Sequence, residues 1–435
     1  MSSNESRNNA RLIFDAALKA VDPYVCVMKH MDHIKNSFKD GGFERIVVVA
    51  AGKGAYPMCR AAEEALGDLI SGGVAVTKYG HGGELKRIEI FEGAHPLPDA
   101  GGARASENII ELLRSSDEKS LVLCLLSGGG SALLVAPAEK LSLDDIQKST
   151  DLLLRAGADI QELNCVRKHL SKVKGGRLAE AAFPSPVISL ILSDVIGDPL
   201  DIIASGPTSP DPTTFEDALR VIDKYDLKSY IPSSVMTHLQ DGASGLIKET
   251  PKEGDEIFSK VNNIIVGNNL IALEAASLKA VELGFEAEIT SDRLSGDASE
   301  LASTLAEYAV KRQSSLDEGG RLCALSGGET TVVVKGKGKG GRNMELALVF
   351  AEKIKGANGI TLLSAGTDGT DGPTDAAGAI VDGDTVIKAA ASGYVAAEYL
   401  EDNDSYNFFA RTEGLLKTGP TGTNVMDLQI MILEK

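Results

Sequence analysis

One pattern recurs along the chain: a short β-branched run, a glycine turn, and then a stretch rich in alanine and leucine. RIVVVAAGKGA is followed by YPMCRAAEEALGDLI, and LVLCLLSGGGS is followed by ALLVAPA. Continuous apolar strands of this kind are typical of parallel sheets that helices cover on both faces. Their alternation with helices predicts a doubly wound α/β fold, in which ligands bind beyond the carboxyl ends of the strands.

The length of the chain predicts two domains. At 435 residues, it exceeds the size at which a single hydrophobic core stops growing. The strand rhythm lapses between about residues 226 and 259, where the sequence is polar and contains glycine and proline. We therefore expect an N-terminal domain over residues 1–240 and a C-terminal domain over residues 241–435.

The charge of the chain excludes several classes of partner. With 62 acidic and 44 basic residues, the net charge is −18, which repels nucleic acid and anionic membranes unless positive charge gathers locally. No apolar run approaches the roughly 20 residues that span a bilayer, and the start MSSNESRNNAR lacks the apolar core of a signal peptide. We expect a cytoplasmic protein whose five cysteines, without a CxxC pair, are buried thiols.

The glycine turn after the first apolar run carries a lysine. In AAGKGA, Gly52 and Lys53 lie where a helix opens, and such a position attracts phosphate or carboxylate; a solvated turn lysine is an equally good interpretation. The turn is no Walker A loop. It is also a poor dinucleotide fingerprint, because Pro57 replaces the third glycine and no acidic residue ends the next strand, VAVTKYG. The sequence therefore disfavours NAD binding.

Three successive glycines follow the next strong apolar run. They let the backbone approach a ligand closely and turn N–H groups towards an oxyanion, although a tight strand-to-helix connection is the alternative. Because a triple glycine costs folding entropy that a plain turn does not require, we favour ligand contact. The candidate binding residues are Ser127, Gly128, Gly129, Gly130 and Ser131.

A basic segment, NCVRKHLSKVKGGRLAEAA, lies further along. Arg167 and Arg177 are candidate anion contacts. Lys168 and Lys172 fit a solvated helix face, and His169 fits a structural role.

Two acidic loops follow apolar strands. A carboxylate of one could hold Mg²⁺, while a carboxylate of the other could orient a substrate hydroxyl or accept its proton, and the sequence does not separate the two roles. Asp194 ends the strand VISLILSDV, and Asp368 opens the turn GTDGTDGPTDAAGA, which also contains Asp371 and Asp375. Mg²⁺ takes one or two carboxylates and completes its shell with water and phosphate oxygens. The alternative for both loops is ordinary turn chemistry.

The densest positive charge lies in VVVKGKGKGGRNMELALVFA. Alternating glycine and lysine predicts a flexible, positively charged flap, in which Lys337 and Lys339 could contact an ATP triphosphate. Arg342 and Asn343 follow at a helix start, where anions bind. A solvated hairpin is the alternative for the lysines.

Several motifs in this order resemble the glycerate 2-kinase family that carries a C-terminal MOFRL domain. They cover nearly the whole chain and are AAGKGA, GAHPLPDAGG, SGGGSALL, NCVRKHLSKVKGGRLA, SDVIGDPLDIIASGPT, GGRNMELAL and AGTDGTDGPTDAAGA. The resemblance implies a Rossmann-like N-terminal domain with a parallel sheet, a smaller α/β MOFRL domain, and an active site in the cleft between them. It also implies that Lys53 and Arg342 face this cleft as catalytic, charge-stabilising residues.

The function that the resemblance implies is transfer of the γ-phosphoryl group from MgATP to D-glycerate, usually at the 2-hydroxyl. The small-molecule partners are then D-glycerate and ATP, and a homodimer is left open. Arg342 is expected to act in the transition state, with its fork on two phosphoryl oxygens, while Arg167 and the SGGGS loop are candidates for the glycerate carboxylate. The alternatives are glycerate 3-kinase activity, an NAD(P)H-dependent hydroxypyruvate reductase, and a non-catalytic small-molecule regulator.

Overall fold

Residues 3–435 are described by the structure, a computed structural model, and they divide into two compact units. Unit 2 is Pro23–Val266, whereas unit 1 combines the described residues up to Asp22 with Gly267–Lys435. This division differs from the boundary drawn between residues 240 and 241, which falls within helix α11 (Ser233–Ala243). The polar stretch that suggested a linker belongs to unit 2. The expected location of the active site between two domains stays a prediction.

Unit 2 is built on a six-stranded sheet with the strand order β3-β2-β1-β4-β5-β6, the order of a Rossmann fold. Strands β1 to β5 pair in parallel. The apolar runs that predicted a doubly wound sheet form its centre, since every residue of β4 and β5 is buried. In sequence order, the elements of unit 2 are α2 (Pro23–Met28), α3 (Met31–Asp40), β1 (Arg45–Ala51), α4 (Ala55–Leu66), η1 (Gly67–Leu69), β2 (Ile70–Lys78), β3 (Ile88–Gly93), α5 (Ala100–Arg114), β4 (Ser120–Leu126), α6 (Gly130–Leu133), α7 (Leu143–Arg155), α8 (Ile160–His169), α9 (Arg177–Ala182), β5 (Val187–Leu192), η2 (Ile203–Ser205), α10 (Phe215–Lys224), α11, η3 (Glu256–Lys260) and β6 (Val261–Gly267).

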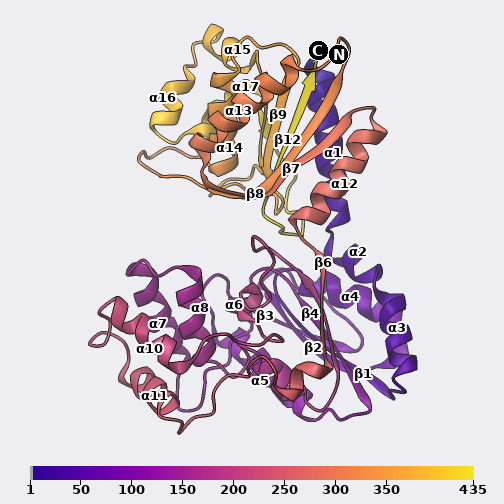
Figure 1. The fold of residues 1–435 in the computed structure, drawn as a ribbon, viewed down its shortest axis with the longest axis vertical. Helices are drawn as coiled ribbons and strands as arrows, with labels where there is room; N and C mark the ends of the chain where they lie inside the picture. Colours follow the sequence, from indigo (N-terminus) through magenta and orange to yellow (C-terminus); the bar gives the residue numbers. More distant parts are fainter. Residues whose placement is uncertain (1–2) are drawn as a thin grey trace. The chain divides into compact units, whose positions relative to one another are not determined.

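Helices cover both faces of this sheet. Apolar side chains of α2, α3 and α4 pack on one face, and those of α5 and α9 pack on the other. The helices α7, α8, α10 and α11 form a further cluster with a core of its own (Figure 1). Strands β1 and β4 are parallel neighbours in the sheet, so their carboxyl ends lie side by side at the same edge.

Unit 1 contains a second sheet, with the strand order β11-β10-β9-β12-β8-β7. Only the pair β7 and β8 is parallel among the pairs of this sheet that the described residues form. The elements of unit 1 are α1 (Ser3–Ala20), α12 (Asn269–Glu282), β7 (Glu286–Asp297), α13 (Ala298–Ser314), β8 (Arg321–Thr331), α14 (Arg342–Lys353), β9 (Ile360–Gly366), β10 (Gly378–Asp382), α15 (Thr385–Ala391), α16 (Ala396–Glu401), α17 (Ser405–Thr412), β11 (Leu415–Leu416) and β12 (Asp427–Glu434).

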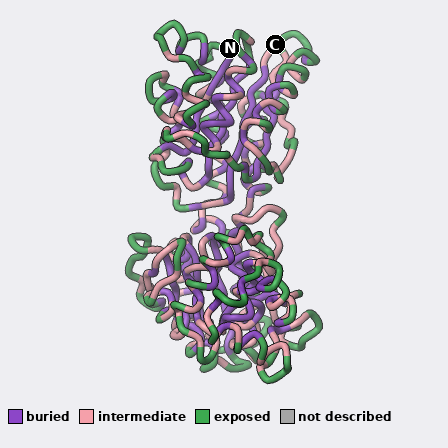
Figure 2. The backbone as a smooth tube through the Cα atoms, turned by 90° about the vertical axis from the view of Figure 1, so that its left-hand side faces the viewer, coloured by how far each residue is buried: buried purple, intermediate pink, exposed green. Residues whose placement is uncertain are grey.

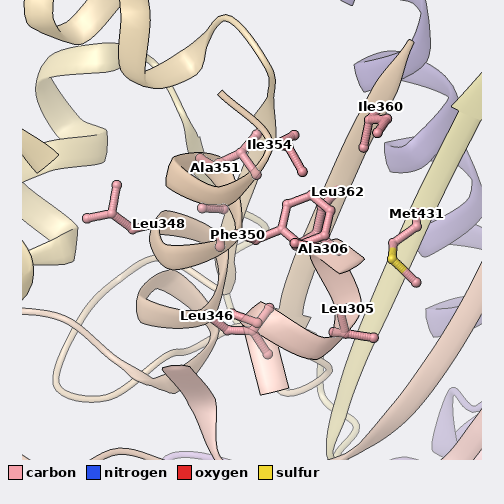
Figure 3. Close-up of a cluster of buried hydrophobic side chains, with 14 of the residues drawn as sticks. Leu305, Ala306, Leu346, Leu348, Phe350, Ala351, Ile354, Ile360, Leu362 and Met431 are labelled. Atoms are coloured by element: carbon pink, nitrogen blue, oxygen red, sulfur yellow. The ribbon is translucent and has the colours of Figure 1, made fainter. Parts of the chain in front are cut away.

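The core of unit 1 lies between this sheet and the helices α13 and α14. Phe350 and Leu346 of α14 meet Leu362 of β9 and Met431 of β12, and α13 adds Leu305 (Figure 3). The central strands are the most deeply buried segments, as the colouring by burial shows (Figure 2). No helix among residues 3–435 is both long and apolar enough to cross a membrane.

The N-terminal helix α1 packs against the C-terminal half of the chain. It lies with α12 on the face of the second sheet opposite α13 and α14 (Figure 1). Arg7 Nε donates to Asp382 Oδ2 at 2.7 Å, and Ser3 Oγ donates to the same oxygen at 2.6 Å. Burial alone would raise the pKa of Asp382, but these bonds outweigh it and lower the pKa to about 2. The carboxylate therefore stabilises the fold above about pH 4, and this contribution is lost as the pH falls towards 2.

We predict that Arg7→Met lowers the free energy of unfolding by about 1.5–3 kcal/mol, because it leaves a buried carboxylate without its charged donor. Urea unfolding of the full chain at pH 7 measures this change. Arg11→Met is the matched control, since Arg11 is exposed on the same helix. Equal effects of the two substitutions would contradict a specific role for the Arg7 contact.

Candidate active site

The ends of β1 and β4 approach each other closely. Gly52 adopts φ +130°, and a side chain there would collide with Ser127. Lys53 N–H donates to the carbonyl of Gly128 at 2.8 Å, and Gly54 N–H donates to Ser127 Oγ at 2.9 Å. The amides of the AAGKGA turn are thus used to join the two strand ends, and Gly52 acts through its lack of a side chain.

The SGGGS loop leaves backbone donors unused. Among residues 23–266, no acceptor pairs with the N–H groups of Gly128, Gly129 or Ser131. Gly129 has φ +81°, and a side chain at Gly128 would collide with Asp194 Oδ2. Successive unpaired amides of this kind form an anion-binding concavity. Gly130 instead packs closely on Ala204.

The side chains of Lys53 and His95 lie against this loop. A Cβ built on Gly129 would lie 3.1 Å from His95 Nε2 and 3.3 Å from Lys53 Cγ. Burial, followed by the charges of Lys53 and Lys78, lowers the pKa of His95 to about 4. His95 is therefore neutral at pH 7, and Lys53 has no ion-pair partner among residues 23–266.

Strained backbone borders the loop on its other side. Ala204 and Ser205 have φ +51° and +63°, a conformation that costs non-glycine residues about 1–3 kcal/mol. Ser205 Oγ lies 2.7 Å from Ser131 Oγ and donates to Asn164 Oδ1 at 3.0 Å. Strain of this kind clusters at functional sites, because the surroundings must hold it in place.

Two cations complete the site. Lys174 is buried and donates to the carbonyls of Ser131 and Leu134 at 2.6 and 2.9 Å. Burial, with help from the Arg167 charge, lowers the pKa of Lys174 to about 7, and burial also lowers that of Arg167. No carboxylate of residues 23–266 pairs with either cation. A small cavity beside them is lined by Pro96, Pro98, Ser131, Thr150, Arg167 and Lys174, with apolar neighbours.

Asp194 is the carboxylate beside the SGGGS loop that could bind a metal ion. Asp194 follows β5 and contacts the position of Gly128. No group of three or more metal-ligating side chains occurs among residues 3–435. An aspartate beside a glycine-rich loop is compatible with Mg²⁺, because this ion takes most of its ligands from water and phosphates.

The rest of the basic segment supports the fold. Lys168 is buried, 3.1 Å from Asp201 and 3.3 Å from Asp211, so the solvated position expected for it is wrong. The half-buried Lys172 pairs with Glu107, and His169 is buried with Nε2 2.9 Å from Glu249, as a structural role requires. The sequence pattern of one helix could not show that Asp201 and Asp211, distant in the sequence, pair with a buried Lys168.

In unit 1, Arg342 is fully engaged. Its Nε and Nη2 donate to the two oxygens of the buried Asp427 at 2.6 and 2.9 Å, and Nη1 lies 2.9 Å from Glu329. Although burial opposes the charge, these contacts raise the pKa of Arg342. The two-donor contact that was expected with a phosphoryl group is thus made with Asp427. The third contact, from Nη1, is with the half-exposed Glu329.

The start of α14 already has a carboxyl group as its cap. Asp371 accepts the N–H groups of Asn343 and Met344 at 3.1 and 2.8 Å. The side chain of Asn343 is buried and accepts from Ser364 Oγ at 2.7 Å. Burial raises the pKa of Asp371 to about 7, while the two amides oppose that rise. The amides expected to bind an anion are therefore occupied by the Asp371 side chain, and the binding role of Asn343 stays a prediction.

The KGKGKGG segment, for which the sequence predicts a flexible flap, makes backbone hydrogen bonds to the loop after α16. The N–H groups of Lys337 and Lys339 donate to Asp402 and Asp404 at 2.8 Å each. A side chain at Gly338 would collide with the backbone near Asp402, so the glycines face the turn and the lysines face solvent. Lys337 and Lys339 are exposed, and their contact with ATP stays a prediction.

The acidic turn after β9 divides into separate contacts. Asp368 accepts from the N–H and hydroxyl groups of Thr370, both at 3.0 Å, as in ordinary turn chemistry. Asp375 pairs with Lys417 at 2.9 Å. The three aspartates of this turn therefore do not form a joint carboxylate site, and the metal-binding role of Asp368 stays a prediction.

Sequence reasoning missed several residues that the structure adds to the site. His95 and Ser205 lie inside the motifs GAHPLPDAGG and SDVIGDPLDIIASGPT, and Lys174 lies among several basic residues, so no local pattern distinguishes them. The position of the GAHPLP segment could have indicated His95, because this segment follows the carboxyl end of β3, at the same sheet edge as Lys53.

Comparisons with known proteins agree along the whole chain. Residues 9–240 match the family described as Domain of unknown function (DUF4147), and residues 322–427 match the MOFRL family. A D-glycerate 2-kinase from Thermotoga maritima is 46% identical over 405 residues, which cover 92% of this chain and 93% of the relative. A glycerate 2-kinase from Pyrococcus horikoshii is 42% identical over 428 residues, with coverage of 96% and 95%.

A solved structure is similar in fold as well as in sequence. The crystal structure of a glycerate kinase from Thermotoga maritima matches with a TM-score of 0.89 and 44% identity, covering 99% of this chain and 100% of that one. The similarity in sequence and in fold extends through both units. The chain therefore belongs to the family of glycerate 2-kinases that carry a MOFRL domain.

Proposed function

We propose that this protein transfers the γ-phosphoryl group of ATP to the 2-hydroxyl of D-glycerate, giving 2-phosphoglycerate. Membership of the glycerate 2-kinase family supports the reaction class. A cytoplasmic location and a homodimer stay predictions from the sequence.

The observation that carries this proposal is a set of cationic and amide donors in unit 2 without anionic partners. Lys53, Arg167 and Lys174 form no ion pair within the unit, next to the unpaired amides of the SGGGS loop. Burying cations without partners costs several kcal/mol each, so such groups are retained where a ligand supplies the anion. Glycerate offers a carboxylate, and ATP offers its phosphates.

We assign the glycerate carboxylate to Arg167 and Lys174, which line the small cavity beside Ser131. The transferred phosphoryl group is assigned to Lys53 and to the amides of Gly128 and Gly129. This arrangement positions the substrates and neutralises charge on the phosphoryl oxygens, which is most of what phosphoryl transfer requires. His95, neutral beside Lys53, adds no competing charge and can accept a hydrogen bond from a substrate hydroxyl.

We assign the metal to Asp194 in preference to Asp368, because only Asp194 lies beside the SGGGS loop within its unit. Bound Mg²⁺ would neutralise phosphate charge during transfer. Asp194 itself would orient the ion and share its charge through one carboxylate.

The main alternative is an NAD(P)H-dependent hydroxypyruvate reductase. Pro57 lies in the first turn of α4, where a dinucleotide fold needs its third glycine, and β2 ends at Lys78 without an acid for the ribose. Both features argue against the reductase. A regulator without catalysis predicts no turnover of either substrate pair.

We predict ATP-dependent conversion of D-glycerate, no NADH or NADPH oxidation with hydroxypyruvate, and loss of activity in EDTA that Mg²⁺ restores. Enolase, added with no phosphoglycerate mutase, identifies the product because it consumes only the 2-isomer. A phosphoglycerate product that enolase does not convert would contradict transfer to the 2-hydroxyl. NADH consumption in proportion to the amount of enzyme would contradict the kinase assignment.

We predict that Arg167→Gln raises KM for glycerate about 10- to 100-fold, the loss expected for a hydrogen bond to a charged group, without lowering the melting temperature. The substitution removes a cation that has no partner within unit 2, so the fold loses no ion pair. Steady-state kinetics and thermal unfolding measure the two effects. Arg155→Gln, on the exposed surface of α7, is the control. A lower melting temperature with an unchanged KM would assign Arg167 a structural role instead.

We propose that Arg342 also acts in catalysis, through the edge that faces Glu329. Arg342→Lys should lower kcat about 10³-fold, as expected for an arginine that stabilises transferring phosphoryl charge. It should also lower the melting temperature, because lysine cannot replace the fork on the buried Asp427. Glu329→Gln, which leaves that fork intact, is the control and should keep stability near normal. Near-normal kcat for Arg342→Lys, measured below its melting temperature, would reduce Arg342 to a structural residue.

A further inference from the structure

Unit 2 contains a second and much larger cavity that the proposed reaction does not use. This α9–α11 pocket has a volume of about 1050 Å³ and lies between the end of α5, α9, α11 and the loops around residues 138–141 and 246–248. It shares only Ser171 with the small cavity beside Arg167 and Lys174. Neither Lys53 nor the SGGGS loop lines it.

The walls of this pocket are positively charged, although the chain as a whole is strongly acidic. Five cations line the pocket against three carboxylates. Arg114 and Lys140 are exposed and have no hydrogen-bond or ion-pair partner within unit 2. The cations are Arg114, Lys140, Lys172, Arg177 and Lys248, and the carboxylates are Glu139, Glu180 and Asp241.

Arg177 differs from the exposed cations of this pocket because it is largely buried and only partly hydrogen-bonded. Its Nη2 donates to the carbonyl of Lys248 at 3.1 Å, while Nη1 lies 3.9 Å from Glu180. Its Nε is buried without any hydrogen-bond partner, and burial lowers the pKa of the guanidinium. A buried donor without a partner is uncommon in folded proteins and indicates a missing acceptor.

The same pocket exposes apolar side chains. Leu246 is 77% exposed and Phe183 is 38% exposed, and both line the cavity with Leu141 and Ile247. Lys248 lies two residues after Leu246 in the sequence, and Arg177 lies on the same helix as Ala181. Cationic and apolar surfaces therefore alternate within one cavity, which matches a ligand that has an anionic group on an apolar body.

We infer that the α9–α11 pocket is a second ligand site, which binds a small organic anion with a ring or other apolar body. The anionic group pairs with Arg177 and with Lys248, whose side chain would exchange its present ion pair with Glu180 for the ligand. The apolar body packs on Phe183 and Leu246. This inference does not depend on the proposed function, because binding can be measured whether or not the protein phosphorylates glycerate.

The probe for this site is the aromatic sulfonate 8-anilinonaphthalene-1-sulfonate, added to the full-length protein. We expect saturable fluorescence at one site per chain, with affinity about tenfold weaker in Lys248→Glu, equivalent to about 1.4 kcal/mol. Thr237→Trp places a bulky group in the pocket from the exposed side of α11 and should also weaken binding. Lys228→Glu is the matched control, since Lys228 is an exposed lysine outside the pocket and should leave affinity unchanged.

Each outcome decides the inference. Unchanged affinity in both pocket variants would overturn it, as would equal losses in the Lys228→Glu control. Circular dichroism confirms that each variant is folded, and the two pocket variants act by different means, charge and volume. Complete displacement of the probe by ATP at concentrations that saturate turnover would also overturn it, because the pocket would then be the nucleotide site of the reaction. Displacement by neither ATP nor glycerate supports a separate site.

Discussion

The contact between the ends of β1 and β4 determines where the candidate active site lies. Gly52 allows Ser127 to approach the turn, and Lys53 N–H then bonds to the carbonyl of Gly128. This bond holds the SGGGS loop with its next amides unpaired, and it sets the Lys53 side chain against the same loop. A Cβ atom at Gly52 would collide with Ser127 and force the two strand ends apart. The positions of Lys53 and of the SGGGS amides therefore depend on glycine at this position.

The candidate site residues of the two units differ in how their charges are paired. Unit 1 satisfies its own cation and its own helix start, since Asp427 holds Arg342 and Asp371 caps α14. Unit 2 leaves Arg167 and Lys174 without carboxylates, at a cost of several kcal/mol that burial imposes on an unpaired charge. A ligand that supplies the anion recovers that free energy, and this difference is why we assign the glycerate carboxylate to unit 2.

Much of the fold could be predicted from the sequence, because it follows from local patterns. Apolar runs such as VISLIL become β5, buried throughout, and the glycine-rich loops do lie at strand ends. The patterns could not reveal pairs that join distant residues: Lys168 with Asp211, or Arg342 with Asp427, 85 positions away. They also could not assign α1 to unit 1, since its partner Asp382 lies near the other end of the chain.

Unit 1 consists of two segments that are separated in the sequence by unit 2, and this order affects how the chain can fold during synthesis. Unit 2 is one continuous segment, so it can fold as soon as Val266 has left the exit tunnel. Strand β12 follows the other strands of the second sheet in the sequence, yet it lies in the interior of that sheet, between β9 and β8. Until β12 has been synthesised, the strands on its two sides cannot pair through it, and the apolar face of α1, which precedes unit 2 in the sequence, lacks part of the sheet on which it packs. A chain that stops before β12 should therefore contain a folded unit 2 and an incompletely folded unit 1.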